Sequence, residues 1–166
     1  MMDGTTPLIA LDAAVIDTET TGLDPRSARV VELAMVRITG GRLDGLSFRR
    51  LVNPGEPIPP TAKAVHGIDT AAVADAPAFA AAWPDFLAAL GDAVVIGHTV
   101  GFDLAILGRE CERAGLAWRP PQTLDTRLLA EWRSVISTPS QLARLSSEKS
   151  ASFGSAISAS RRVSRV

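Results

Sequence analysis

The apolar positions in the first half of the chain follow the spacing of β-strands. Runs rich in β-branched residues cover residues 13–17, 30–38 and 46–52, and turns that contain glycine or proline follow the second and third runs. The connections between the three runs are short, which favours antiparallel pairing between neighbours. We therefore predict three antiparallel strands at the start of the domain.

In the second half, the apolar positions follow the spacing of helices, with one buried strand between them. The run at residues 93–97 is wholly apolar, as expected for a strand buried on both faces. Thr61 and Gly67 are suited to cap and end a short helix, and Pro84 is expected to kink or restart a longer one. The longer predicted helices cover residues 77–90, 100–114 and 125–132. This order predicts an α/β domain with a mixed sheet and flanking helices.

Two carboxylates stand two residues apart where the first predicted strand leaves the core. Successive side chains of a strand point to opposite faces, so Asp17 and Glu19 project from one face and Thr18 from the other. Two hard oxygen ligands held side by side on a rigid strand suit Mg²⁺ or Mn²⁺. A solvated strand end carries the same pair, so the residues around it decide between the two interpretations.

Those residues resemble the motifs of the DEDD superfamily of 3'–5' exonucleases (DEDDh type), in the branch that contains the proofreading epsilon subunit of bacterial DNA polymerase III. Residues 17–23, Asp-Thr-Glu-Thr-Thr-Gly-Leu, match the first motif without a gap. Residues 97–103, Gly-His-Thr-Val-Gly-Phe-Asp, are similar to the second motif, with Thr99 where Asn is more usual. Residues 64–68 and 124–126 resemble two further family elements. The likeness covers roughly the first 132 residues.

The resemblance implies a ribonuclease-H-like fold and phosphodiester hydrolysis with two Mg²⁺ or Mn²⁺ ions. Asp17, Glu19 and Asp103 would be the catalytic, metal-binding residues: Asp17 would bridge both ions, Glu19 would hold the ion on the nucleophile side, and Asp103 would hold the other, partly through water. The expected partners are the 3' end of a single-stranded nucleic acid and a DNA polymerase subunit. The substrate-side candidates are Thr20, Thr21, Gly22, Leu23, His66 and Phe102.

Simpler interpretations of three of these residues stay open. Asp103 is also suited to interact with the dipole at its helix N-terminus. His66 favours the C-terminal dipole of its short helix as readily as it favours a substrate contact. His98 is interpreted as structural, and Asp125 as a helix N-cap and not as a fourth carboxylate ligand.

The family's third motif, a His followed five residues later by an Asp on the last helix, is not found in the sequence. No His follows His98, and the only acidic residue after Glu131 is Glu148. The resemblance assigns the general base and the fourth carboxylate to that motif, so we expect activity to be strongly reduced or lost. Two functions remain open: a 3'–5' exonuclease of the proofreading type, and a catalytically inactive nucleic-acid- or polymerase-binding module of the same fold.

The composition of the chain changes abruptly near residue 132. Residues 1–132 hold 17 acidic and 11 basic residues, whereas residues 133–166 hold one acidic and six basic residues and 11 of the 13 serines. Such a segment buries too little apolar surface to offset its ordering entropy. We predict an exonuclease-like domain at residues 1–132, with its C-terminal part truncated or aberrant. The Ser/Arg-rich segment 133–166 is predicted to be disordered or to result from a reading-frame change, and a truncated product that folds incompletely is the third interpretation.

The length, net charge and cysteine count of the whole chain limit the class of protein. A length of 166 residues fits one domain, and a net charge of −1 is not typical of proteins that bind nucleic acid by bulk electrostatics. The sequence contains no 18-residue apolar run and no basic N-terminal region, and Cys111 is its one cysteine. These features predict a cytoplasmic protein that does not bind membranes.

Overall fold

The computed structural model describes residues 12–128, and the fold below belongs to the compact unit that ends at Thr126. Up to Ala114, three strands followed by two helices, a strand and a helix occur in the order that the hydrophobic pattern predicts. The strands are β1 (Ala13–Thr20), β2 (Val30–Thr39), β3 (Arg42–Leu51), β4 (Val94–Gly97) and β5 (Thr123–Asp125), and the helices are α1 (Pro60–His66), α2 (Phe79–Leu90) and α3 (Gly101–Ala114).

The strands form one mixed sheet in the order β3-β2-β1-β4-β5. β1 pairs antiparallel with β2, and β2 pairs antiparallel with β3. β1 with β4 and β4 with β5 pair parallel. The predicted antiparallel start and mixed sheet are therefore confirmed. A bulge interrupts the β1–β2 register between Glu19 and Thr20, and bulges of this kind redirect side chains at the end of a strand.

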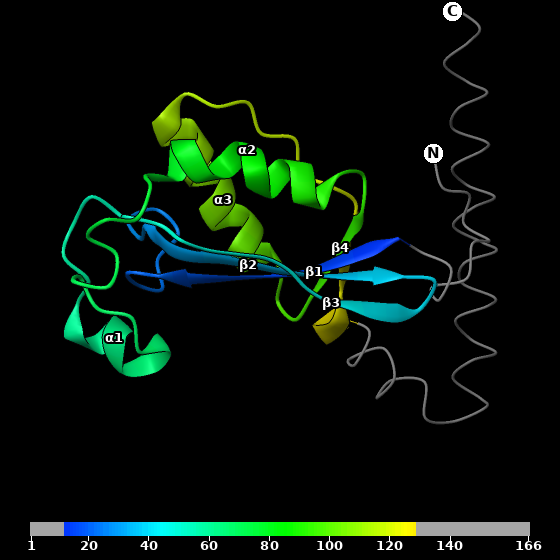
Figure 1. The fold of residues 1–166 in the computed structure, drawn as a ribbon, viewed down its shortest axis with the longest axis horizontal. Helices are drawn as coiled ribbons and strands as arrows, with labels where there is room; N and C mark the ends of the chain where they lie inside the picture. The colour runs from blue at the N-terminus through cyan, green and yellow to red at the C-terminus, as the bar shows by residue number, and fades with distance from the viewer. Residues whose placement is uncertain (1–11, 129–166) are drawn as a thin grey trace, which may run out of the picture. The chain divides into compact units, whose positions relative to one another are not determined.

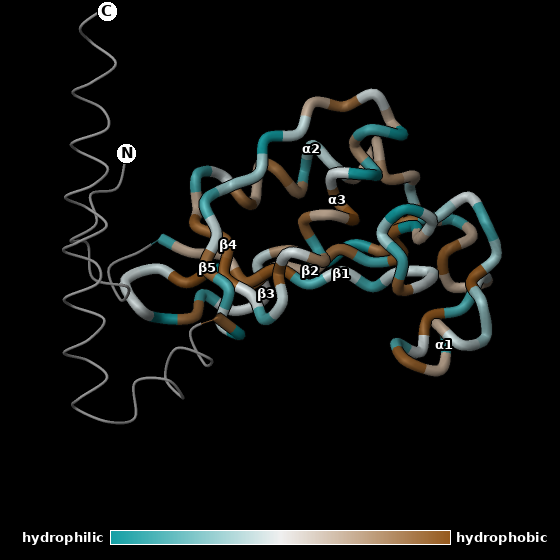
Figure 2. The backbone as a smooth tube through the Cα atoms, turned by 180° about the vertical axis from the view of Figure 1, so that it is seen from behind, coloured by the Kyte–Doolittle hydropathy of each residue, from teal (hydrophilic) through white to brown (hydrophobic). Residues whose placement is uncertain are grey.

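Helices α2 and α3 cover the same face of the sheet (Figure 1). Hydrophobic stretches run through β2 and β4 in particular (Figure 2). Phe79, Trp83 and Phe86 of α2 stack on one another along the buried side of that helix. The helix continues through Pro84, which is exposed, because the aromatic side chains on the opposite side hold it against the sheet. The buried core includes Ile16, Leu33, Met35, Ile106 and Leu107.

The short helix α1 is held by a second, smaller apolar cluster. Its Ala62 packs with Val31, Ile58 and Val73. The predicted cap at Thr61 is wrong: the helix begins at Pro60, and no side chain caps it, because proline at the first position has the helical φ and needs no partner for an N–H group. The predicted end is confirmed, since Gly67 closes α1 with φ 78°.

The last part of the domain differs from the sequence-based expectation. Residues 123–125 form β5 beside β4, where the sequence predicted only a helix from residue 125. A strand of three residues has no readable periodicity, and its place is set by main-chain pairing such as Val95 N–H to Gln122 O (2.8 Å).

Residues 126–128 are helical. The predicted boundary at residue 132 and the segment 133–166 lie outside the described residues. Within residues 12–128, no helix is long and apolar enough to cross a membrane.

The turn between β4 and α3 is tightly constrained. A side chain at Gly97 would place its Cβ 2.8 Å from that of Val100, so the turn requires glycine there. Thr99 has φ 61°, and among the described residues it is the one non-glycine residue with a positive φ. Its N–H donates to Oδ1 of Asp125 at 3.0 Å. A β-branched residue in this conformation is strained by about 1–3 kcal/mol, whereas Asn tolerates it well.

Replacing Thr99 by Asn should therefore raise the free energy of unfolding, by about 0.5–1 kcal/mol. The measurement is urea denaturation followed by far-ultraviolet circular dichroism. Thr61→Asn, on the exposed side of α1, is the matched control and should change stability by less than about 0.5 kcal/mol. An equal effect of the two substitutions would show that Thr99 stores no strain.

Candidate active site

The end of β1 presents the two predicted carboxylates. Asp17 and Glu19 lie inside the strand with side chains on the same face; Asp17 is exposed and Glu19 is half-buried. Thr18 lies on the opposite, helix-covered face and is buried. The predicted strand geometry of this pair is thus confirmed.

Asp103 reaches the same strand from the first turn of α3. Its Oδ1 accepts hydrogen bonds from the N–H (3.0 Å) and the Oγ1 (2.7 Å) of Thr18. β4 pairs only with Ala13, Ala14 and Val15 of β1, so beyond Val15 the strand has no neighbour on that side to accept its N–H groups. The Asp103 carboxylate takes the place of the missing strand and brings together two segments 85 residues apart in sequence.

The carboxylates at this position influence one another's ionisation. Partial burial, followed by the charge of Asp17, raises the pKa of Glu19, while nearby His66 opposes the shift. Burial also raises the pKa of Asp103, against the hydrogen bonds from Thr18, and the charge of Asp17 adds to the rise. Negative charges held close together in this way favour either protons or a cation between them.

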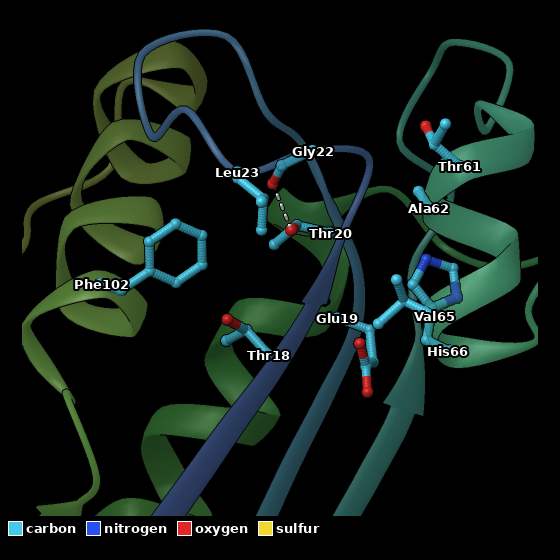
Figure 3. A pocket seen from close by; sticks show the side chains of 10 residues that line it. All are labelled: Thr18, Glu19, Thr20, Gly22, Leu23, Thr61, Ala62, Val65, His66 and Phe102. Atoms are coloured by element: carbon cyan, nitrogen blue, oxygen red, sulfur yellow. Dashed lines mark hydrogen bonds between the residues drawn. The ribbon is translucent and has the colours of Figure 1, made fainter.

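A cavity of about 510 Å³ opens beside these groups, at the C-terminal end of β1. Figure 3 shows Phe102 on one side of the strand, and Glu19, Val65 and His66 on the side of α1. Leu23 and Val65 are large apolar side chains that remain 89% and 85% exposed, which is typical of a surface that receives a ligand. The lining residues are Thr18, Glu19, Thr20, Gly22, Leu23, Thr61, Ala62, Val65, His66 and Phe102.

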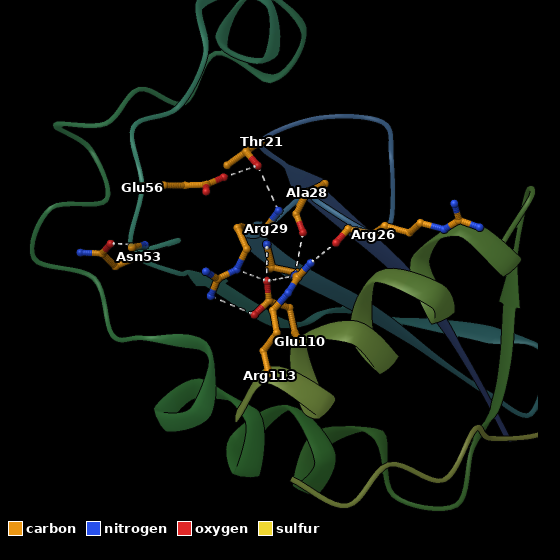
Figure 4. A network of polar contacts seen from close by, with 10 residues as sticks. Thr21, Arg26, Ala28, Arg29, Asn53, Glu56, Glu110 and Arg113 are labelled. Atoms are coloured by element: carbon orange, nitrogen blue, oxygen red, sulfur yellow. Dashed lines mark hydrogen bonds and ion pairs between the residues drawn. The ribbon is translucent and has the colours of Figure 1, made fainter. Parts of the chain in front are cut away.

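Five of the six predicted substrate-side residues line this cavity, and Thr21 does not. The Thr21 hydroxyl donates to Oε1 of Glu56 (2.9 Å) and accepts from the N–H of Arg29 (3.0 Å), so it holds the loop instead (Figure 4). Asp17 and Asp103 stand next to the cavity wall without forming part of it. Sequence analysis did not predict Thr18, Thr61 or Ala62 as lining residues and included Val65 only within the family element at residues 64–68. For Thr61 and Ala62, the position on the short helix that carries His66 was the available signal.

His66 lines this cavity and holds a buried, unpaired donor. Its Nδ1 accepts the N–H of Ile68 at 3.1 Å, so the Nε2 of the neutral ring carries the proton. That Nε2 is buried and has no hydrogen-bond partner among the described residues. A buried donor left unpaired costs about 1–3 kcal/mol of stability. His66 lies both in the last turn of α1 and at the cavity, so the helix-dipole and substrate-contact interpretations both stay predictions.

The loop that follows β1 is anchored by a buried carboxylate that the sequence did not single out. Glu110 of α3 is 2% exposed and accepts from Arg29 Nε (2.6 Å) and Nη2 (3.2 Å) and from the Val30 N–H (3.3 Å). Arg113 also donates to it at 3.1 Å and binds the main-chain oxygens of Ala28 (2.9 Å) and Arg26 (2.7 Å) (Figure 4). The loop that carries Gly22 and Leu23 is thereby fixed to α3.

Among the residues that the structure describes, no three His, Cys, Asp or Glu side chains gather as a ready-made metal-binding group. Asp103 uses Oδ1 for Thr18, while Asp17 and Glu19 face away from that hydrogen bond. The donors themselves fit a hard divalent cation, because they are oxygen ligands whose mutual repulsion such an ion would relieve.

Glu110→Gln is expected to lower the free energy of unfolding by about 1–3 kcal/mol, because it removes the charge that two arginines share. The loss is smaller than for a fully buried pair since Arg29 and Arg113 are 30% and 29% exposed. Glu112→Gln is the control on the same helix: its pair with Arg109 is exposed, and its loss should cost less than about 0.5 kcal/mol. Urea denaturation of the two variants measures the difference, and equal values would contradict an anchoring role for Glu110.

Known proteins with similar sequences are named as exonucleases or as DNA polymerase III subunit epsilon. A DNA polymerase III subunit epsilon-like protein of Rhodobacter capsulatus is 46% identical over 127 residues, which are 75% of this chain and 18% of that protein. The DNA polymerase III subunit epsilon of Aquifex aeolicus is 35% identical over 115 residues, which are 69% of this chain and 56% of the relative. This chain therefore spans only part of the length of these relatives.

Solved structures agree on the architecture. Exonuclease X in complex with 5' overhanging duplex DNA aligns with a TM-score of 0.58 and 30% identity, over 75% of this chain and 64% of that one. Exonuclease I of E. coli in complex with a dA16 oligonucleotide aligns with a TM-score of 0.63 and 18% identity, over 76% and 30% of the two chains, and shows the likeness of fold. The predicted ribonuclease-H-like sheet is confirmed. The family model described as Exonuclease (RNase_T) matches residues 14–136, and the chain accordingly belongs to this exonuclease family.

Proposed function

We propose that this chain is a metal-dependent 3'–5' exonuclease domain of the proofreading type, which removes nucleotides from the 3' end of a single-stranded nucleic acid. The observation that carries the proposal is the cavity at the end of β1, whose wall includes Glu19 and which lies beside Asp17 and Asp103. A terminal nucleotide in this cavity would have its phosphate beside the carboxylates and its base among apolar side chains.

The walls of the cavity suit a nucleotide. Phe102 offers a ring on which a base can stack, and Leu23 and Val65 offer apolar surface to the base and sugar. The His66 ring adds to the wall on the side of α1. Exonuclease X and Exonuclease I are both seen with DNA, and the epsilon names of the relatives support a DNA polymerase as partner.

Asp17, Glu19 and Asp103 are the residues that would hold the divalent ions, Mg²⁺ or Mn²⁺. When bound, such ions neutralise the phosphate and acidify a coordinated water. The role of the protein's own residues is to orient the 3' end. The loop anchored by Glu110 positions Gly22 and Leu23, and α3 positions Phe102. A solved form of E. coli Exonuclease I contains zinc, which supports a divalent cation in this fold.

No group in the described site is placed as the general base. The Nδ1 of His66 accepts the N–H of Ile68 and its Nε2 is buried, so neither ring nitrogen is free to take a proton from a water in the cavity. Loss of a positioned base slows such reactions by about 10²–10⁴-fold. The absence of any His after His98 also supports a second candidate function, a nucleic-acid- or polymerase-binding module that retains the fold without turnover.

Hydrolysis of a 5'-labelled single-stranded oligonucleotide by the purified 166-residue chain tests the proposal. With Mg²⁺ or Mn²⁺ we expect slow shortening from the 3' end, about 10²–10⁴-fold slower than that of a relative with a complete third motif. Asp17→Asn should abolish it, because that residue is proposed to bind both ions. Asp92→Asn, an exposed residue between α2 and β4, is the matched control and should leave the rate unchanged. Binding without shortening would favour the binding module instead.

Metal binding can be measured without activity, by the effect of Mn²⁺ on thermal stability. The raised pKa values of Glu19 and Asp103 mean that the folded state holds protons more tightly than the unfolded state, so metal-free stability should fall as pH rises through the carboxyl range. Mn²⁺ replaces those protons and should stabilise by about 2.7 kcal/mol at a concentration 100 times its Kd at neutral pH, and by much less near pH 4.

Asp17→Asn is expected to stabilise the metal-free protein and to remove the stabilisation by Mn²⁺. It should raise the metal-free melting temperature at neutral pH, since one repelling charge is removed, and it should abolish the effect of Mn²⁺. A Mn²⁺ effect that survives in this variant would place the ion elsewhere.

A further inference from the structure

A second hollow, of about 350 Å³, lies outside the candidate active site and is lined by Arg26, Arg109, Glu112 and Arg113. Arg26 belongs to the loop between β1 and β2, and the other three belong to the C-terminal half of α3. Three guanidinium groups face a single carboxylate, so the hollow is positively charged. It stands out because residues 1–132 carry 17 acidic and only 11 basic residues.

The three arginines are not equally engaged. Arg113 is held by buried Glu110 and by main-chain oxygens of the loop. Arg109 pairs at 2.6 Å with Glu112, which is itself 66% exposed. The guanidinium of Arg26 donates no hydrogen bond to any residue that the structure describes, and Figure 4 shows it extending away from Glu110. A planar guanidinium without a partner, next to a second one with a weak surface partner, suits a phosphate group.

The hollow is built on the same two elements as the active-site cavity. In the loop, Leu23 lines the cavity and Arg26 lines the hollow. In α3, Phe102 lines the cavity and Arg109 lines the hollow. Arg109 comes seven positions after Phe102, which corresponds to a rise of about 10 Å along the helix axis. Stacked nucleotides rise about 3.4 Å each, so this spacing corresponds to about three nucleotides.

We propose that Arg26 and Arg109 bind a backbone phosphate of the nucleic-acid strand, about three nucleotides upstream of its 3' end. The inference rests on the proposed function, because the 3' end in the active-site cavity sets the direction of the strand. The contact would give the domain a preference for strands longer than a dinucleotide. It would also supply positive charge at a distance from the three carboxylates.

The test compares the binding of fluorescein-labelled oligothymidylates of two and eight nucleotides to the full chain, by fluorescence anisotropy. A phosphorothioate at the last link prevents hydrolysis during the measurement. Arg26→Ala should weaken binding of the octamer about three- to tenfold and reduce the slope of log K against log salt by about 0.7, with the dimer unchanged. The variant keeps the main-chain oxygen that accepts from Arg113, so the loop retains its anchor.

Arg42→Ala is the matched control, since Arg42 is exposed at the β2–β3 hairpin, away from the end of β1. It should leave both oligonucleotides unaffected. An unchanged octamer affinity in Arg26→Ala, or equal weakening of dimer and octamer, would overturn the phosphate contact while leaving the proposed function intact. Failure of the unaltered chain to bind either oligonucleotide would overturn the proposed function and this inference together.

Discussion

The candidate site depends on one carboxylate oxygen, Oδ1 of Asp103, which completes the hydrogen bonding of β1 where β4 has ended. β4 covers only three residues of its neighbour, so the N–H of Thr18 faces a gap in the sheet. A helix whose first turn carries an acidic residue fills that gap, and the Thr18 hydroxyl adds a second bond. The same contact therefore stabilises the sheet edge and positions an acidic residue beside Asp17 and Glu19.

Helix α3 is fixed to the β1 segment at two places, and this makes the cavity a defined shape. Asp103 holds its first turn to the strand, and Glu110 holds its third turn to the loop through Arg29 and the Val30 N–H. Burying the Glu110 carboxylate is unfavourable unless its partners satisfy it, and two arginines and an amide do so. With α3 held at these two anchors, Phe102, next to Asp103, and the residues that follow β1 have little freedom to move apart.

The hydrophobic pattern was sufficient for the sheet order at the start of the domain and for the common face of Asp17 and Glu19, because a strand repeats every two residues. It could not place Thr21, since the direction of a loop side chain depends on distant groups such as Glu56 and Arg29. Nor could it find β5 or the role of Glu110. Both depend on tertiary contacts, with β4 in one case and with the loop 80 residues earlier in the other. The proximity of Asp103 to β1 was accessible only through the family resemblance.

If an acidic domain acts on a polyanion, as proposed for this one, binding must be separated from repulsion. The carboxylates that suit a cation also repel a phosphate, and their raised pKa values express that repulsion in the absence of an ion. Apolar walls at Leu23, Val65 and Phe102 attract the uncharged part of a nucleotide regardless of the ion. The hollow lined by Arg26 and Arg109 would, as proposed, add attraction away from the carboxylates. The proposed strand binding uses groups that the described residues supply, whereas rapid hydrolysis needs a proton acceptor, and His66, whose Nδ1 already accepts from Ile68, is no substitute. Affinity and turnover are therefore separable in this domain, and the first can persist where the second is slow.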